Sequence, residues 1–177
     1  GDILWQGGNT PQTHFIEDQL CGMFNIFLKK HNIPISVDSF EYEDKNLFER
    51  FEKLHDKYKN IDVLVINSQP CSYQYTYNKD NWDYFVTRLS EKYRVATTEK
   101  VNDDIISLRD ISVKNIAAIA LKVKIIIAIN TGPSVPLYNT NILDNVDTIY
   151  MFDNDLYNFK TRKFIKKRYI RDLQFLL

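Results

Sequence analysis

A run of β-branched residues that stops at a glycine-containing turn constrains the fold of this chain more than any other stretch. Residues 124–130 read Lys-Ile-Ile-Ile-Ala-Ile-Asn, and Thr-Gly-Pro-Ser follows at 131–134. Residues 112–123 before it carry apolar side chains at helical spacing, with Asp110 or Ser112 as the N-terminal cap. A helix, a strand buried on both faces and a polar turn are the units of a parallel α/β sheet.

The rest of the chain alternates between strand and helix patterns. Helices are predicted at 15–31, 44–60 and 81–93 with a short one within 136–145, and strands at 3–5, 33–40, 61–66, 94–101 and 146–152. The last 18 residues are expected to form an extended piece and a short basic helix. We therefore predict an α/β fold, namely a single Rossmann-like three-layer domain over residues 1–177 with a mostly parallel sheet. Residues 1–60 would supply additional β/α units, 61–153 the core and 154–177 a basic C-terminal extension.

Composition narrows the class of protein. The chain has 23 Lys and Arg against 23 Asp and Glu, so no global field favours nucleic acid as a partner. Two cysteines, Cys21 and Cys71, do not make a disulfide framework. Neither a signal peptide nor an apolar run of about 20 residues is found, so we expect no transmembrane segment and a cytoplasmic protein.

Polar residues follow three of the predicted strands. Thr131, Gly132, Pro133 and Ser134 end the central strand, where the free N–H groups of a following helix and two hydroxyls favour phosphate. An ordinary β–α turn is the alternative, since such turns use the same residues. Asn67, Ser68 and Gln69 end strand 61–66, and Thr98 lies at the end of another. Because parallel strands open their carboxyl ends on one edge, we expect these groups to converge.

The loop from 70 to 80 carries Tyr73, Tyr75, Tyr77 and Lys79. Long loops in compact domains are often functional, and aromatic rings can stack on a base or a sugar. A tyrosine-rich surface loop is the alternative. Among the histidines only His14 is a candidate for acid–base chemistry, and no catalytic residue can be named.

The order of motifs from Val63 to Phe152 resembles the C-terminal, donor-binding half of GT-B glycosyltransferases of the ADP-heptose:lipopolysaccharide heptosyltransferase type. Lys79-Asp-Asn-Trp82 corresponds to a Lys-x-x-Trp pattern that opens a helix in that family. Asn130-Thr-Gly-Pro-Ser-Val135 corresponds to the Asp-Thr/Ser-Gly-Pro-Met-His turn that contacts the donor diphosphate there. Asn130 stands in place of the family's Asp, and Ser134-Val135 in place of Met-His.

The resemblance implies a glycosyltransferase-related domain, reduced or excised, that binds a nucleotide-sugar and transfers the sugar to a glycan or lipid-linked acceptor. A homodimer or attachment to a second domain would complete it, and no cofactor or metal is expected. The donor-binding residues would be Asn67, Ser68, Gln69, Lys79, Thr98, Asn130, Thr131, Gly132, Pro133 and Ser134. The alternative from another class is a non-catalytic glycan- or protein-interaction module of a larger protein, which would use the tyrosine-rich loop and the basic tail.

Overall fold

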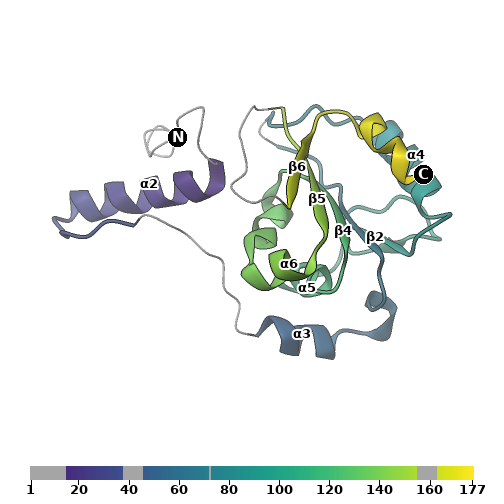
Figure 1. Cartoon of the computed structure of the whole chain (residues 1–177), viewed down its shortest axis with the longest axis horizontal. Coiled ribbons are helices and arrows are strands. Elements are labelled where there is room, and N and C mark those ends of the chain that lie inside the picture. The colour runs from purple at the N-terminus through teal and green to yellow at the C-terminus, as the bar shows by residue number, and fades with distance from the viewer. Residues whose placement is uncertain (1–14, 38–45, 72, 155–162) are drawn as a thin grey trace. The chain divides into compact units, whose positions relative to one another are not determined.

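The computed structural model describes residues 15–37, 46–71, 73–154 and 163–177, and it divides into two compact units. The described part of the smaller unit is 15–37, and the larger unit contains the rest (Figure 1). The strand predicted at 3–5 and His14 lie outside the described residues. Within the described ranges, no helix is long and apolar enough to cross a membrane.

The smaller unit is helix α2 (Phe15–Lys30) and the segment that follows it. The helix ends at Lys30, and Asn32 two residues later has a left-handed φ of 55°. The amide of Asn25 then donates to the carbonyl of Val37 at 2.9 Å and accepts from its N–H at 2.7 Å. The prediction of a strand at 33–40 is wrong for residues 33–37. The end of this segment is hydrogen-bonded to a side-chain amide and not to a neighbouring strand.

The larger unit is built on one sheet of six strands, and every neighbouring pair is parallel. The strands are β1 (Val63–Ile66), β2 (Val95–Thr97), β3 (Ile106–Ser107), β4 (Ile125–Ile129), β5 (Thr148–Phe152) and β6 (Phe164–Lys167). Their spatial order is β3-β2-β1-β4-β5-β6 (Figure 1). This is the doubly wound order of a Rossmann-like sheet. The predicted α/β fold is confirmed, although β3 was not predicted.

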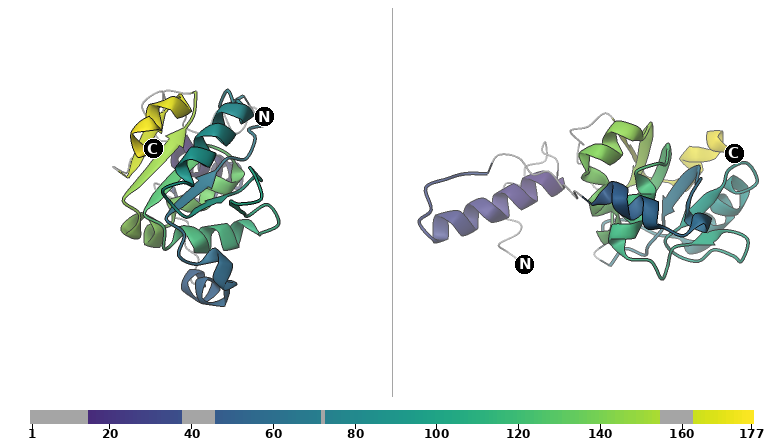
Figure 2. Two further views of the ribbon diagram at one scale, coloured as in Figure 1. Left: turned by 90° about the vertical axis from the view of Figure 1, so that its right-hand side faces the viewer. Right: turned by 90° about the horizontal axis from the view of Figure 1, so that it is seen from below.

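Helices cover both faces of this sheet. They are α3 (Leu47–Lys53), η1 (Asp56–Tyr58), α4 (Lys79–Leu89), α5 (Val113–Ala120), η2 (Gly132–Tyr138), α6 (Thr140–Asn145) and η3 (Ile170–Leu176), the η elements being 3₁₀ helices. Figure 2 shows η3 beside α4 on one face, while α3, α5, η2 and α6 pack with one another on the other. Within the predicted C-terminal extension, residues 164–167 are therefore part of the sheet and residues 170–176 are part of one helical layer.

The single helix predicted at 44–60 is shorter than expected. α3 ends at Lys53, because Leu54 turns to extended backbone with ψ 146° and buries its side chain. His55 then begins η1, its Nδ1 accepting the N–H of Lys57 at 3.1 Å. The apolar periodicity continues through this break, which is why the pattern predicts one helix.

Aromatic packing dominates the core between the sheet and α4. Trp82 is 1% exposed, and its ring centroid lies 4.9 Å from that of Phe152 and 6.1 Å from that of Tyr75. Its indole N–H donates to the hydroxyl of Tyr75 at 3.4 Å. The same cluster includes Val65 of β1 and Leu173 of η3, so Trp82 joins the sheet, α4 and the C-terminal segment.

We expect Trp82→Ala to destabilise the protein by about 3–5 kcal/mol, because it leaves a large cavity where three elements meet. Urea unfolding followed by circular dichroism measures the change. Tyr84→Ala is the matched control on the same helix, since that ring is 68% exposed and its loss is expected to cost less than about 1 kcal/mol. Equal losses in the two variants would contradict this account of the core.

Candidate functional site

The reversal of strand order between β1 and β4 defines the candidate site. These strands pair from Val63 with Ile125 to Ile66 with Ala128, so both end at the same edge. The residues that follow them are 67–69 and 130–134. Thr98, after β2, lies on the other side of β1 and its N–H donates to the carbonyl of Val65 at 3.0 Å. The structure thus brings most of the predicted site residues to one edge of the sheet.

Asn67 ties the ends of β1 and β2 together. It is 0% exposed, and its Oδ1 accepts the N–H of Glu99 at 2.8 Å and the hydroxyl of Thr98 at 3.2 Å. The backbone N–H of Asn67 donates to Oγ1 of Thr98 at 3.0 Å, and Oγ of Ser68 lies 3.0 Å from that same oxygen. These side chains are engaged within the protein. Gln69 is the exposed residue of this segment.

The turn after β4 is also held by internal hydrogen bonds. The buried Asn130 donates from Nδ2 to the carboxylate of Asp153. Oγ of Ser134 accepts the N–H of Thr131 at 3.2 Å and donates to its carbonyl at 2.8 Å. Oγ1 of Thr131 donates to the carbonyl of Ile129 at 3.2 Å. Both hydroxyl hydrogens therefore point to backbone carbonyls, although the oxygens keep lone pairs for a further donor.

Gly132 is the most open position of this turn. A Cβ placed there would meet no atom within 4 Å, and its φ lies outside the left-handed region. Neither packing nor backbone geometry within the described residues therefore requires glycine. Gly132 is exposed and is the first residue of η2, where a backbone N–H has no partner inside the helix. The following element is a seven-residue 3₁₀ helix with Pro133 and Pro136, not a long α-helix.

Lys79, the remaining predicted contact, is the first residue of α4. Asn78 caps this helix, its Oδ1 accepting the N–H of Asn81 at 3.0 Å. The ammonium of Lys79 pairs with Oδ2 of Asp83, and the side chain is 57% exposed. Oδ1 of Asp83 is buried and has no hydrogen-bond partner among the described residues. Lys79 is thus accessible, but it already has a carboxylate partner.

The tyrosine-rich loop crosses the ends of β4 and β5, and sequence reasoning missed the two residues that hold it there. Nε2 of Gln74 donates to the carbonyl of Asn130 at 3.0 Å. The backbone carbonyl of Gln74 accepts the N–H of Asn154 at 2.6 Å. The side chain of Asn154 donates to the carbonyl of Tyr73 and to Oγ1 of Thr76, both at 3.3 Å. The position of Asn154 just after a predicted strand was the available signal.

The loop divides its tyrosines between core and solvent. Tyr73 is 96% exposed and has a left-handed φ of 57°, whereas Tyr75 is 7% exposed. Tyr77 is half-buried against Trp82, with ring centroids 6.0 Å apart. Burial, with the nearby carboxylates of Asp83 and Glu99, raises the pKa of Tyr77 to about 12. The three tyrosines of this loop therefore have three different environments.

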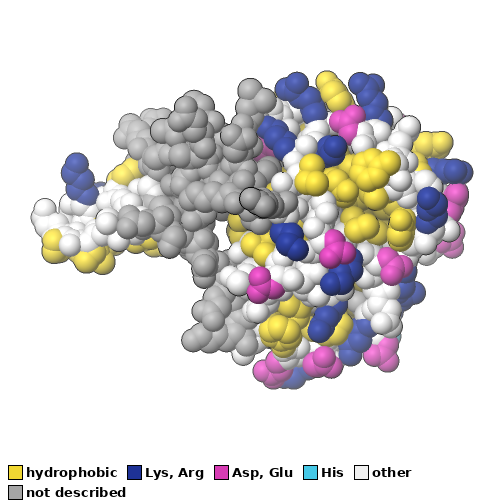
Figure 3. All heavy atoms as spheres, in the orientation of Figure 1, with side chains coloured by type: hydrophobic (Ala, Val, Ile, Leu, Met, Phe, Trp, Pro, Cys, Tyr) yellow, Lys and Arg dark blue, Asp and Glu magenta, His cyan; other side chains and the backbone are white. Residues whose placement is uncertain are grey.

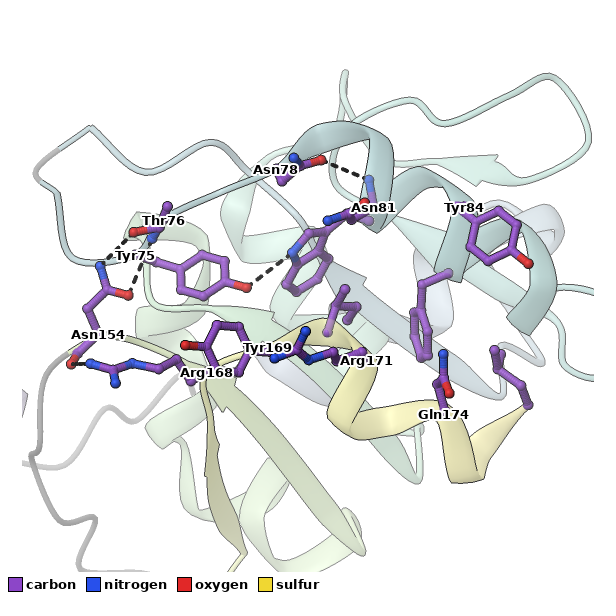
Figure 4. Close-up of a pocket in the computed structure, with 14 residues that line it drawn as sticks. Tyr75, Thr76, Asn78, Asn81, Tyr84, Asn154, Arg168, Tyr169, Arg171 and Gln174 are labelled. Atoms are coloured by element: carbon purple, nitrogen blue, oxygen red, sulfur yellow. Dashed lines mark hydrogen bonds between the residues drawn. The ribbon is translucent and has the colours of Figure 1, made fainter.

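A pocket of about 800 Å³ lies beyond this loop (Figure 4). Its walls come from the loop, from α4 and from the C-terminal segment, and Asn154 lies at one side. The residues are 75, 76 and 78 of the loop, 81, 82, 84 and 85 of α4, and 168–171, 174 and 177. Sequence reasoning missed the pocket because its walls come from segments about 90 residues apart. No group of three or more His, Cys, Asp or Glu residues that could hold a metal ion occurs in the described part of the chain.

Comparisons with protein-family models, with curated proteins and with solved structures find no match to this chain. The assignment of function therefore depends on the geometry above and on the resemblance in sequence.

We expect Asn67→Ala to destabilise the protein by about 1–3 kcal/mol, because it leaves the N–H of Glu99 and the hydroxyl of Thr98 without their acceptor. Gln69→Ala is the control, with an expected change within about 0.5 kcal/mol for an exposed side chain. Urea midpoints of the two variants measure this difference. A neutral Asn67→Ala would show that the edge does not depend on this amide.

Stability is expected to fall as pH rises from 10 toward 12. The pKa of Tyr77 is higher in the folded protein than its ordinary value of 10.0, so the neutral phenol favours the folded state. That contribution is complete below pH 10 and is lost as the pH passes through the folded pKa. Urea unfolding across this range should show a smaller loss for Tyr77→Phe than for the wild type. An identical loss in both proteins would contradict the assignment to Tyr77.

Proposed function

We propose that the larger unit is a glycosyltransferase-related domain that binds a nucleotide-sugar by its diphosphate at the carboxyl edge between β1 and β4. The observation that carries the proposal is the strand order, which reverses between these two strands. Open α/β sheets bind their ligands in the crevice at that point. The Thr-Gly-Pro turn that resembles the diphosphate contact of GT-B enzymes follows β4 there.

The hydrogen bonds divide the predicted donor residues into two roles. The side chains of four of them are buried and hydrogen-bonded within the protein, so in this proposal they shape the edge: Asn67, Thr98, Asn130 and Ser134. Gln69, Lys79, Thr131 and Gly132 are at least partly exposed and would contact the ligand, with Ser68 and Pro133 beside them. The N–H of Gly132 is the preferred contact, because the open space beside it admits a phosphate oxygen.

One cation among the predicted donor-binding residues, Lys79, suits the leaving group of a sugar transfer. In such a transfer the bond between the anomeric carbon and a phosphate oxygen breaks, and the oxygen of an acceptor hydroxyl bonds to that carbon. The hydroxyl proton passes to solvent, and the nucleoside diphosphate leaves as the anion. Lys79 would neutralise the phosphate after exchanging Asp83 for it, since an ammonium is a point charge with three donors. Hydrogen bonds from backbone N–H groups supply the rest of the stabilisation.

A non-catalytic interaction module remains the second candidate, because aromatic rings are displayed near the same edge. Tyr73 is 96% exposed, and its carbonyl is held by Asn154, so the loop presents this ring on a fixed backbone. Exposed aromatic rings are typical of glycan and protein contacts. This candidate predicts binding of a partner without any affinity for nucleoside diphosphates.

Isothermal titration with UDP, GDP and ADP tests the proposal. We expect dissociation constants between micromolar and millimolar for at least one of them, and progressive weakening in Gly132→Ala and Gly132→Val. Because the added atoms have open space in the free protein, thermal unfolding should stay close to wild type while Gly132→Val loses about tenfold or more in affinity.

Three results would contradict the proposal. One is no heat with any of the three nucleotides, and another is unchanged affinity in a folded Gly132→Val. The third is a nucleotide that shifts the NMR signal of the Trp82 indole but not that of the Gly132 amide, since that ligand would occupy the pocket beside α4. Thr140→Val, at an exposed position on α6, is the control for a valine introduced at an exposed position away from the edge.

A further inference from the structure

The pocket beside α4 has an apolar floor and a polar mouth. Trp82, Phe85 and Ile170 are nearly buried and form the floor, and the cavity of about 800 Å³ is large enough for a monosaccharide derivative or a nucleotide. In Figure 4 the side chains of Arg168, Arg171 and Gln174 come from the C-terminal segment, opposite those from the loop and α4. The walls are thus two elements that share one hydrophobic cluster.

Two arginines give this pocket a positive character. Arg168 donates from Nη2 to the carbonyl of Asn154 at 3.5 Å, and neither it nor Arg171 pairs with a carboxylate among the described residues. Among the residues that the structure describes, no acidic side chain lines the cavity. The carboxylate of the nearby Asp172 accepts the N–H of Tyr169 at 3.4 Å. Figure 3 shows Lys and Arg side chains beside an apolar patch near this end of the larger unit.

Arg171 is preorganised for an anion. Its guanidinium carbon lies 4.6 Å from the centre of the Tyr169 ring. A cation–π contact uses no N–H group in a hydrogen bond, so the guanidinium donors stay available for the paired oxygens of a phosphate or carboxylate. Among the described residues, the guanidinium of Arg171 has no ion pair or hydrogen bond that an incoming anion would first have to break.

Side-chain amides at the mouth suit hydroxyl groups. Asn81 and Gln174 are exposed, and no side-chain hydrogen bond of either is found within the described protein. An amide offers donors and an acceptor together, which matches a sugar hydroxyl better than it matches an apolar ligand. Tyr84, which is 68% exposed, adds an aromatic face and a phenol at the same mouth.

We propose that this pocket is a second ligand site, which binds an anionic carbohydrate, that is a sugar bearing a phosphate or a carboxylate. The anion lies on the guanidinium of Arg171, Arg168 adds positive charge on the other side of Tyr169, and the hydroxyl-bearing ring lies between Asn81, Gln174 and the aromatic rings. The site uses none of the residues assigned to the diphosphate at the β1–β4 edge. A test of this site therefore does not depend on whether the proposed function is correct.

Titrations of the whole chain, followed by NMR of the Trp82 indole and the Arg171 guanidinium, test this site. The probes are glucose 6-phosphate and glucuronate, with glucose and inorganic phosphate as their uncharged and sugar-free counterparts. We expect saturable shifts with one or both of the anionic sugars, at least about tenfold tighter than with glucose, because charge-assisted hydrogen bonds are lost without the anion. Inorganic phosphate should also bind at least about tenfold more weakly.

Variants separate the arginines from general surface charge. Arg171→Gln and Arg168→Gln should each weaken the anionic sugar by about fivefold or more, while Arg88→Gln should not. Arg88 is the matched control, since it lies in the last turn of α4, pairs with Glu91 and does not line the pocket. Binding of UDP at the β1–β4 edge should be unchanged in both pocket variants.

Four results would overturn the proposal. The first is no saturable shift with either anionic sugar up to about 10 mM, the weak end of the range for a real site. The second is glucose binding as tightly as the sugar phosphate, which would show that the anion is not needed. The third is inorganic phosphate binding as tightly, which would show that the sugar ring is not needed. The fourth is a folded Arg168→Gln, Arg171→Gln double variant with wild-type affinity.

Discussion

The pairing of β1 with β4 is the contact on which the rest of this fold depends. Both strands are buried on both faces, so each needs a helical layer above and below. The chain leaves β1 toward α4 on one face and leaves β4 toward η2 and α6 on the other. Because the two connections diverge, the edge between them stays open. The crevice is thus a consequence of the crossover topology rather than of any particular polar residue.

Asparagines after the strands then fix that edge. Asn67 follows β1, Asn130 follows β4 and Asn154 lies two residues beyond β5, and each bonds through its amide to a neighbouring segment. A buried amide must be satisfied in this way, since an unpaired one costs about 1–3 kcal/mol. A polar residue at the end of a strand is therefore weak evidence of a ligand contact. Exposure of Gly132 and Gln69 separates them from these structural amides.

The sequence was sufficient to predict elements whose pattern is local. It was not sufficient where contacts between distant segments determine the structure. Residues 125–129 are five apolar residues in a row, which is sufficient to predict a buried strand. β3 has only two residues and exists because β2 pairs with it, so no periodicity indicates it. The helix over 44–60 breaks at Leu54 because burying that side chain is favoured over one more helical turn.

The pocket beside α4 was not predictable for the same reason. Trp82 and Ile170 are both apolar residues in helical segments, and nothing in either segment indicates that the two pack together. The contact arises because β6 pairs with β5 and returns the chain across the sheet to α4. Arg168 and Arg171 then line a pocket whose floor is apolar. The side chains of that floor cannot form ion pairs with the two arginines as carboxylates would. Two exposed cations of the basic tail are thereby held at the mouth of a pocket, where no carboxylate among the described residues pairs with them and their donors are available to an anion.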